Sequence, residues 1–503
     1  MNQNIINEAA EVLRSKIGAT KVLTDEFIRA SYNHDISLYA YDYSIPGMII
    51  LPESVEDVQA IVQEANRLHI PIVAIGGNTF GNGNIESNQG IVVDFSKMNK
   101  ILEIDESNMT FTVEGGANIH AVNETLHKMG YCYPTYPLCF GPITFGSEVS
   151  KNSGGEVGSM FGHVAKRVIG LEAVVGTGDV IVTGSSNTLK TSPHFIQSSL
   201  PDLTGLFISA EGAFGLITKV TMQMQVVPKY TAGADVKFEP TMEGFKAACD
   251  FVNELRTYKG LICNAHLLDC YSGWLDERFF TGSTDVSPEV EEEALQRAGH
   301  IVLLEFEGYT SQEECDRKVT DALKIAESHS GAYTGTMMSD IFARAEHGDL
   351  KLTEIVYAGG FVGCMIMTNT PYEKMPELYA AWLKNVEELG LPKPYTSMIV
   401  AMGDDCCMPF YYPWHPRREL SEEAEWNATM EKWKELANRT YEDALETGSV
   451  PYAVSRKWRP YLLDKLDKGY LNYIQGVKKL FDPNNIFNPG VSVFEEAEHE
   501  SNQ

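Results

Sequence analysis

The stretch that decides the fold is PIVAIGGNTFGNG, residues 71–83, in which an apolar strand runs directly into a glycine-rich turn. Four glycines fall within the last eight positions of this stretch. Without a Cβ, such a backbone can bring several N–H groups close to one anion. A second stretch, TFGSEVSKNSGG at residues 144–155, has the same character. Together the two turns predict a cradle for the phosphates of a nucleotide cofactor.

The first turn differs from the two common phosphate-binding patterns. The spacing G-x-G-x-x-G that opens a helix in doubly wound folds is absent, because the polar residues after Gly83 lead into an apolar strand at 90–94. A glycine loop ending in the P-loop lysine is absent as well. Taken alone, residues 76–83 are also compatible with a plain tight turn, so their meaning depends on the rest of the chain.

The elements around this turn have the pattern of an α/β half. An apolar strand at 48–51 is followed by Ser54, a typical N-cap residue, and then by apolar residues at helical spacing up to Leu68. With the strand at 71–75 this makes a strand–helix–strand unit. Other elements expected in this half are helices at 6–16 and 119–128 and strands at 90–94, 109–113 and within 167–182.

The pattern changes near residue 228. Helices at 312–328 and 376–389 there alternate with isolated strands such as 301–306, which predicts an α+β second domain. From about residue 422 the chain is again expected to be helical, and it closes on the stretch FDPNNIFNPG at 481–490.

Composition excludes several classes of protein. The 503 residues carry 40 basic and 69 acidic side chains, a net charge of −29, which disfavours nucleic acid and anionic membrane surfaces as partners. Nine cysteines without a Cys-x-x-Cys argue against a disulfide scaffold, a structural zinc or an iron–sulfur cluster. The sequence has neither a signal-peptide pattern nor an apolar run long enough to span a membrane, so we expect a cytoplasmic protein.

Eight motifs in a fixed order identify a family resemblance. They are PESVEDV at 52–58, GGNT at 76–79, VVDFS at 92–96, VEGGA at 113–117, GSEVSKNSGG at 146–155, LTGLF at 203–207, AEGAFGLIT at 210–218 and FDPNNIFNPG at 481–490. This series closely resembles the vanillyl-alcohol oxidase and p-cresol methylhydroxylase superfamily of FAD enzymes. The resemblance covers nearly the whole chain and is strongest at 45–225 and 480–490.

The resemblance implies an α+β fold in three parts. A two-subdomain FAD-binding domain of the p-cresol methylhydroxylase type is expected at 1–225 and an inserted α+β substrate or cap domain at 226–440. A C-terminal helical segment at 441–503 would return to the flavin and complete the FAD domain. The implied cofactor is FAD.

The resemblance also implies which residues hold the cofactor. Those wrapping the pyrophosphate from one side would be Gly76, Gly77, Asn78, Thr79 and Gly81. Those on the other side would be Gly146, Ser147, Asn152 and Gly155, and the adenosine end would be lined by Glu211, Gly215 and Ile217. Pro137 and Asn488 complete the expected set. For Ile217, packing in the core is an equal alternative.

The substrate domain departs from the 2-hydroxy acid dehydrogenases of the superfamily. Those enzymes hold a divalent metal with a Gly-His-x-Gly-Asp-Gly-Asn-x-His stretch, whereas this chain has AMGDDCCM at 401–408. The histidines are missing, and Asp404 and Asp405 alone are poor ligands for that purpose. We therefore expect no metal, and Asp404 and Asp405 become candidates for the catalytic base.

The chain matches the phenol-oxidising branch in part. Tyr452 corresponds to one phenolate-binding tyrosine, but Ala453 stands where arginine is expected, and Arg456 is the candidate substitute. Leu138 replaces the expected acidic residue after Pro137. Tyr412, together with Tyr136 and Tyr411, is a candidate aromatic lining, the alternative being half-buried tyrosines that each make one hydrogen bond.

Two further residue pairs remain open. Cys406 and Cys407 fall near a covalent flavin attachment position of the phenol branch, but buried free thiols are the commoner explanation. His163 and His120 are interpreted as packing or cap residues rather than catalytic bases.

These observations predict an FAD-dependent oxidoreductase that transfers hydride from a small alcohol or a benzylic or phenolic substrate to flavin N5. A D-2-hydroxy acid dehydrogenase of the lactate or glycolate type is the first alternative. A non-catalytic flavin subunit of an electron-transfer complex is the second. The sequence leaves open whether oxygen or a redox protein accepts the electrons, and whether the chain forms a homodimer.

Overall fold

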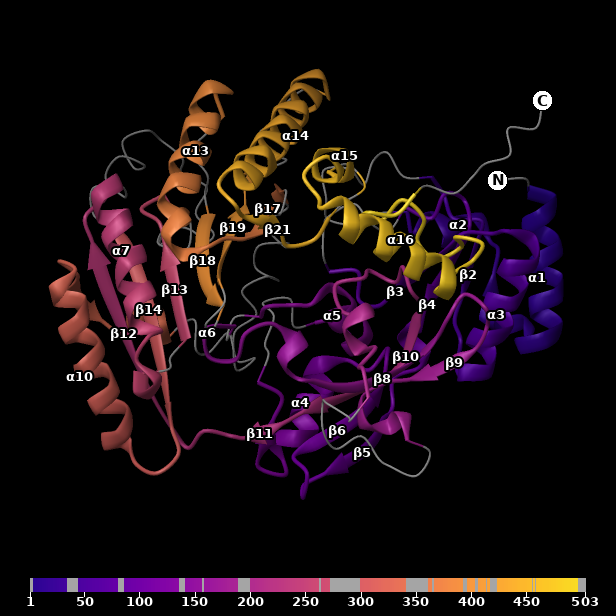
Figure 1. The fold of residues 1–503 in the computed structure, drawn as a ribbon, viewed down its shortest axis with the longest axis horizontal. Helices are drawn as coiled ribbons and strands as arrows, with labels where there is room; N and C mark the ends of the chain where they lie inside the picture. The colour runs from indigo at the N-terminus through magenta and orange to yellow at the C-terminus, as the bar shows by residue number, and fades with distance from the viewer. Residues whose placement is uncertain are drawn as a thin grey trace.

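The computed structural model describes most of the chain, with gaps. The described residues are 3–33, 44–79, 86–134, 141–155, 158–188, 200–261, 264–271, 299–340, 361–363, 366–391, 396–402, 406–412, 414–416, 423–454, 456 and 458–495. Figure 1 shows two bodies: one built from the N-terminal 230 residues and covered in part by the yellow C-terminal helices, and one built around a large sheet drawn in pink to orange. This arrangement confirms the expected α+β fold with an inserted second unit.

The first subdomain is a four-stranded sheet flanked by helices. Its strand order is β1 (Val22–Leu23), β2 (Met48–Ile50), β4 (Ile91–Asp94), β3 (Ile72–Ile75), with β2, β4 and β3 parallel. The helices are α1 (Gln3–Ile17), the short α2 (Glu26–Ala30) and α3 (Val55–Leu68). As predicted, Ser54 caps α3, its side chain accepting the amide of Asp57 at 3.2 Å.

The second subdomain is an antiparallel sheet. Its strand order is β5 (Ile101–Asp105), β6 (Thr110–Glu114), β10 (Leu216–Gln223), β8 (Val168–Val174), β9 (Val180–Val182). Helices α4 (Ile119–His127), α5 (Phe145–Lys151) and α6 (Gly158–Phe161) connect these strands. A small ladder of β7 (Tyr131–Cys132) and β11 (Gln225–Val226) closes the subdomain before the chain leaves it.

The second body is an eight-stranded sheet. Its strand order is β15 (Ala332–Gly335), β12 (Tyr230–Phe238), β14 (His300–Gly308), β13 (Asn264–Leu268), β18 (Thr396–Met402), β19 (Cys406–Tyr412), β17 (Ile366–Asn369), β21 (Val450–Pro451). A separate pair joins β16 (Phe361–Gly363) and β20 (Trp414–Pro416). Four helices pack on one face of the large sheet: α7 (Met242–Leu255), α10 (Gln312–Ser328), α13 (Met375–Glu388) and α14 (Glu423–Glu446).

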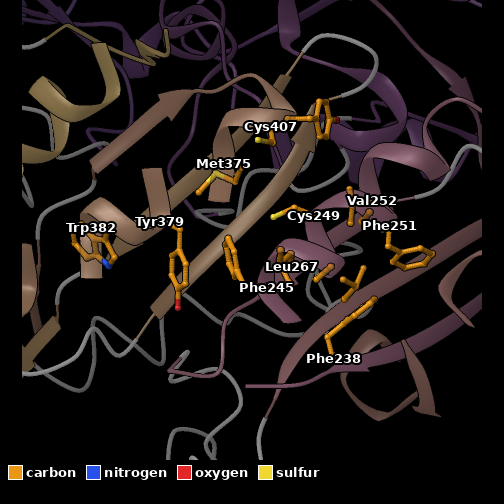
Figure 2. Close-up of a cluster of buried hydrophobic side chains, with 14 of the residues drawn as sticks. Phe238, Phe245, Cys249, Phe251, Val252, Leu267, Met375, Tyr379, Trp382 and Cys407 are labelled. Atoms are coloured by element: carbon orange, nitrogen blue, oxygen red, sulfur yellow. The ribbon is translucent and has the colours of Figure 1, made fainter. Parts of the chain in front are cut away.

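The helix-covered face of this sheet holds the largest apolar core. Figure 2 shows Leu267 of β13 among Phe245, Cys249 and Phe251 of α7 and Tyr379 and Trp382 of α13. The Phe245 and Tyr379 rings stack with centroids 3.8 Å apart. The opposite face of the same sheet, which we call the inner face, is turned toward the first body in Figure 1.

The C-terminal segment returns to the first body. Helices α15 (Arg459–Leu463) and α16 (Lys468–Phe481) lie beside it in Figure 1. After α16 the chain runs along β3: the amide of Ile72 donates to the Ile486 carbonyl at 2.7 Å, and the amide of Asn488 donates to the Ile72 carbonyl at 2.8 Å. The segment thereby reaches the strand that carries the first glycine turn. The domain boundaries at 225 and 440 stay predictions.

Candidate functional site

The two glycine turns, which are separated by about seventy residues in sequence, meet in space. A Cβ on Gly76 would overlap the Thr144 hydroxyl, and a Cβ on Gly77 would overlap the Pro142 carbonyl oxygen. Because the second obstacle is backbone, it cannot move aside as a flexible side chain could. Both positions therefore require glycine for the end of β3 to fit against the start of α5.

A third glycine layer lies behind the second turn. The amide of Gly146 donates to the Gly115 carbonyl at 2.7 Å, and the amide of Gly115 donates to the Thr218 carbonyl at 2.8 Å. A Cβ on Gly146 would lie 2.8 Å from the same Gly115 oxygen. Three chain segments are thus packed backbone against backbone. The amide of Gly146 already donates to the Gly115 carbonyl, so it is not offered to a bound anion. Gly146 instead allows the two backbone segments to approach each other closely.

These segments line an open cavity with about 630 Å³ of empty space, open solvent included. Its lining comprises Ala74, Ile75, Gly76, Phe95, Gly115, Thr144, Gly146, Ser147, Ser150, Lys151, Glu211, Gly212, Gly215, Leu216, Ile217 and Asn488. Of the expected cofactor residues, Gly76, Gly146, Ser147, Glu211, Gly215, Ile217 and Asn488 line it. At Gly76, Gly146 and Gly215 a Cβ would collide with protein atoms behind the cavity wall, so these glycines let the backbone segments pack closely. A wall built from such backbone suits the diphosphate of FAD, and the residues present fit this cofactor.

The remaining expected cofactor residues lie near the cavity or outside the described chain. Asn78 has a left-handed backbone with φ of 50° immediately after the two glycines. Asn152 ends α5 with φ of 54°, and its side chain accepts the amide of Ala165 at 3.0 Å. Gly155 has φ of 64°. Thr79 ends the described part of the first turn, whereas Gly81 and Pro137 lie outside the described residues.

The loop at 210–217 closes the far side of the cavity. Glu211 pairs with Lys151 at 2.7 Å, and its carbonyl accepts the Asn488 side-chain amide at 2.9 Å. A Cβ on Gly215 would lie 2.9 Å from the Val174 carbonyl oxygen. Ile217 lines the cavity and is also part of the core of the second subdomain, so its packing in the core is observed and its place at the adenosine end stays a prediction. Lys151 was not predicted, although its place inside the second glycine motif was the signal for it.

Comparison with known proteins assigns this geometry to a family. Residues 46–184 match the family described as FAD binding domain, and residues 245–491 match FAD linked oxidases, C-terminal domain. The chain belongs to the FAD-linked oxidoreductases. The first match covers both glycine turns, and the second covers the strands of the large sheet other than β12 and the returning C-terminal segment up to residue 491. The expected cofactor, FAD, and the expected enzyme class are both confirmed.

Relatives of this oxidoreductase differ in the substrates that they are named for. "Glycolate oxidase subunit GlcD" of Bacillus subtilis (strain 168) is 26% identical over 94% of this chain and 96% of its own length. The D-2-hydroxyglutarate dehydrogenase of Stutzerimonas stutzeri (strain A1501) is 25% identical over 95% and 97%. The D-lactate dehydrogenase of Anaerostipes hadrus is 23% identical over 94% and 95%.

Solved structures confirm the fold of the oxidoreductase. The 4-ethylphenol oxidase of Gulosibacter chungangensis aligns with a TM-score of 0.85 and 17% identity, covering 99% of this chain and 98% of its own. The p-cresol methylhydroxylase aligns with a TM-score of 0.81 and 18% identity, covering 98% of each chain. The expected p-cresol methylhydroxylase-type fold is therefore confirmed.

Tyr452 of the oxidoreductase lies where the sheet of the second body meets the second glycine turn. Its phenol is buried and hydrogen-bonds with the Ser153 side chain and the Gly154 backbone. Burial raises the pKa of Tyr452, so the side chain stays neutral. The His163 ring stacks on the Tyr452 ring with centroids 6.2 Å apart. Tyr452 is thereby held against the cradle.

Arg456 is connected to the cavity through a second residue. Its guanidinium Nη2 donates to the Asn488 side-chain oxygen at 2.9 Å, and Asn488 in turn lines the cavity. Arg456 therefore supports the cavity wall through its hydrogen bond to Asn488. Asp404 and Asp405 lie outside the described residues, as do the side chain of Tyr412 and the positions Tyr136 and Leu138.

The two cysteines after Asp405 occupy different environments. Cys407 is buried in the helix-covered core, its Sγ donates to the Thr370 carbonyl at 3.3 Å, and burial raises the pKa of its thiol. This placement matches the free-thiol interpretation. Cys406 is half-buried, and its Sγ donates to Asn369 at 3.7 Å. Within the described part of the chain, no group of three or more His, Cys, Asp or Glu could hold a metal ion.

Glu148 is a buried carboxyl that sequence reasoning missed. It lies on α5 between cavity residues Ser147 and Ser150, and its Oε2 accepts the Tyr133 hydroxyl at 3.2 Å. Burial raises the pKa of Glu148 well above its ordinary value, because the charged form would be desolvated. The helix carrying the second glycine turn thus packs around a carboxyl that favours its neutral form.

His120 is a surface residue, with its ring nitrogen 3.4 Å from Glu124. It takes no part in the site. In the described chain, no helix has the length and apolar character needed to cross a membrane. The cytoplasmic location stays a prediction.

Proposed function

We propose that this oxidoreductase removes hydride from a C–H bond of a small alcohol or of a benzylic or phenolic substrate and delivers it to flavin N5. FAD supplies the hydride acceptor when bound. The observation that carries the proposal is the position of Tyr452, a buried phenol bonded to Ser153 and Gly154 beside the cradle. An aromatic wall at that place suits an aromatic substrate.

The chain's own residues contribute positioning and the exclusion of water. The glycine turns hold the diphosphate end of the cofactor, and Tyr452 with His163 forms a packed aromatic pair at the substrate side. Arg456 keeps Asn488 in the cavity wall. Orientation of this kind supplies much of the rate in cofactor enzymes.

Oxidation of a D-2-hydroxy acid is the second candidate. The full-length relatives named for glycolate, D-lactate and D-2-hydroxyglutarate support it. The stretch AMGDDCCM at 401–408 disfavours it, because the histidines that bind the metal in such enzymes are missing. The two candidates differ in the substrate that reduces the flavin.

Anaerobic mixing separates them. The FAD-loaded protein is mixed with 4-alkylphenols, benzylic alcohols and D-2-hydroxy acids, and bleaching of the flavin absorbance is followed. We expect bleaching by an aromatic compound. Bleaching by hydroxy acids alone would overturn the proposal in favour of the second candidate. A non-catalytic flavin subunit would show no turnover of any of these compounds with an artificial electron acceptor.

A further inference from the structure

The inner face of the large sheet carries buried polar side chains on β13. Ala265 and Leu267 belong to the helix-covered core, where Figure 2 shows Leu267. Because side chains alternate along a strand, Asn264 and His266 occupy the opposite, inner face. Only 1% of Asn264 and 2% of His266 is exposed. These two residues are therefore buried between the sheet and whatever covers its inner face.

Helix α6 ties this part of the inner face to the cofactor half. The Ser159 hydroxyl accepts the amide of Ala265 at 3.0 Å and lies 3.2 Å from the Ala265 carbonyl. The Arg167 guanidinium lies 4.3 Å from the centroid of the Phe161 ring, at the other end of the helix. In Figure 1, α6 lies between the sheet and α5. β13 is thus fixed at the boundary between the two bodies.

The same boundary contains the substrate-side residues. Only two residues separate Gly155 from the start of α6, and the amide of Val164 donates back to the Ser153 carbonyl at 2.8 Å. Ser153 is also a partner of the Tyr452 phenol, which comes from the far end of the same sheet. Asn264 and His266 thus lie on the strand that α6 contacts, whereas Tyr452 follows β21, the last of the eight strands in the order.

The chemistry of this polar group suits an oxygen anion. An imidazole and a carboxamide both donate N–H bonds, and burial makes such donors selective for a charged acceptor. Glu305 of β14 is directly opposite Asn264 in the register and is 6% exposed. From that position a carboxylate can accept one N–H of Asn264 or His266 and orient the pair. The neighbours Leu268 and Leu303 are apolar and buried, so the polar residues form a distinct patch.

We propose that His266 and Asn264 bind the anionic oxygen of the substrate, a phenolate or a carboxylate, on the inner face of the sheet. The inference rests on the proposed function, since it adds to that site the group that recognises the substrate. A buried hydrogen bond to a charged group is strong enough for its loss to change affinity by about tenfold or more.

The test measures the binding of probes to the FAD-loaded protein, and the change in the flavin absorbance spectrum reports the binding. The probes are 4-nitrophenolate, benzoate and neutral benzyl alcohol. We expect His266→Gln and Asn264→Ala each to weaken the binding of one or both anions by about tenfold or more. The affinity for benzyl alcohol is expected to change by less than about twofold. Loss for 4-nitrophenolate alone identifies a phenolate site, and loss for benzoate alone identifies a carboxylate site.

His300→Gln is the matched control. His300 is also a buried histidine of this sheet, but it faces the helices, where its ring nitrogens bond with the Cys270 amide and the Thr241 carbonyl. We expect unchanged affinity for all three probes. The proposal would be overturned if His266→Gln weakened the binding of benzyl alcohol and of the anions equally, or if it weakened the binding of neither anion. It would also be overturned if the unaltered protein failed to bind either anion. Flavin bleaching by a substrate in that case leaves the proposed function standing, so the two failures are distinguishable.

Discussion

The cofactor half and the sheet of the second body depend on different kinds of contact. In the cofactor half the decisive contacts are backbone against backbone, as at Gly77 with Pro142 and Gly146 with Gly115. In the second body the decisive features are side chains on a sheet face, such as Asn264 and His266. A backbone site tolerates few residue types and is therefore readable as a motif, whereas a side-chain site can be rebuilt for each substrate.

Adding one methyl group at the glycine cradle tests the backbone side of this comparison. We expect Gly77→Ala to lose FAD, with affinity reduced by about 100-fold or more, because the new Cβ would overlap the Pro142 carbonyl. The flavin-to-protein ratio after purification and titration with FAD measure the effect. Gly205→Ala is the control, since a Cβ there has no neighbour within 4 Å. Normal flavin content in Gly77→Ala would refute the backbone account.

The buried ion pair behind the cradle tests whether the C-terminal segment supports it. Lys478 donates to Asp482 at 2.6 Å, to the Ala213 carbonyl at 2.7 Å and to the Phe487 carbonyl at 3.0 Å. We expect Lys478→Met to lower the free energy of unfolding by about 3–5 kcal/mol, because Asp482 would be left buried without its cation. Chemical denaturation of the FAD-free protein measures this.

The control for this ion pair is Lys324→Met, which removes an exposed partner of Asp321 and is expected to cost less than about 1 kcal/mol. Similar losses in the two variants would mean that the buried pair gives the segment no special support.

Glu148 gives the comparison a pH dependence. Burial raises its folded-state pKa well above the ordinary value of a glutamate, so the folded protein binds this proton more tightly than the unfolded chain does. The stabilising contribution is complete below the unfolded pKa and is lost as pH rises through the folded pKa. We expect Glu148→Gln to remove this loss and to stabilise the protein at pH 7 by about 1 kcal/mol or more.

Unfolding free energies between pH 4 and 8 check the Glu148 prediction. Glu103→Gln, at an exposed position of β5, is expected to leave the pH profile unchanged. If the unfolding free energy of Glu148→Gln changed with pH in parallel with that of the unaltered protein, the interpretation of Glu148 as a neutral carboxyl would be wrong.

Tyr452→Phe is the mildest change and tests the side-chain half of the comparison. Removing the hydroxyl leaves its Ser153 and Gly154 partners without this bond, so we expect a stability loss of about 1 kcal/mol with full flavin content. Rapid mixing with the substrate that the anaerobic experiment identifies should show slower flavin reduction. An unchanged reduction rate would remove Tyr452 from the substrate side of the site.

Sequence patterns predicted the cofactor half well, because its glycines and caps have local physical causes. The cap at Ser54 followed from local residue patterns, and the convergence of the two glycine turns followed from their shared glycine-rich character. In the second body, the helix at 312–328 followed from its apolar spacing. The eight-stranded sheet did not, since its pairing of β13 with β14 and β18 joins segments far apart in the chain. His266 and Glu148 were missed for the same reason: a single polar residue among apolar ones has no periodic signal, and its burial depends on tertiary contacts.

The route of the last segment has a consequence for biosynthesis. Ile486 and Asn488 hydrogen-bond to Ile72, the first residue of the strand that leads into the first glycine turn, and Asn488 completes the cavity wall. While the ribosome still encloses Ile486 and Asn488, the emerging N-terminal part has its glycine turns but lacks one side of the pocket. Domains fold as they leave the exit tunnel, so the flavin can be captured in its finished site only after these residues have emerged. The prosthetic group is then acquired as a late step of maturation rather than as a nucleus for early folding.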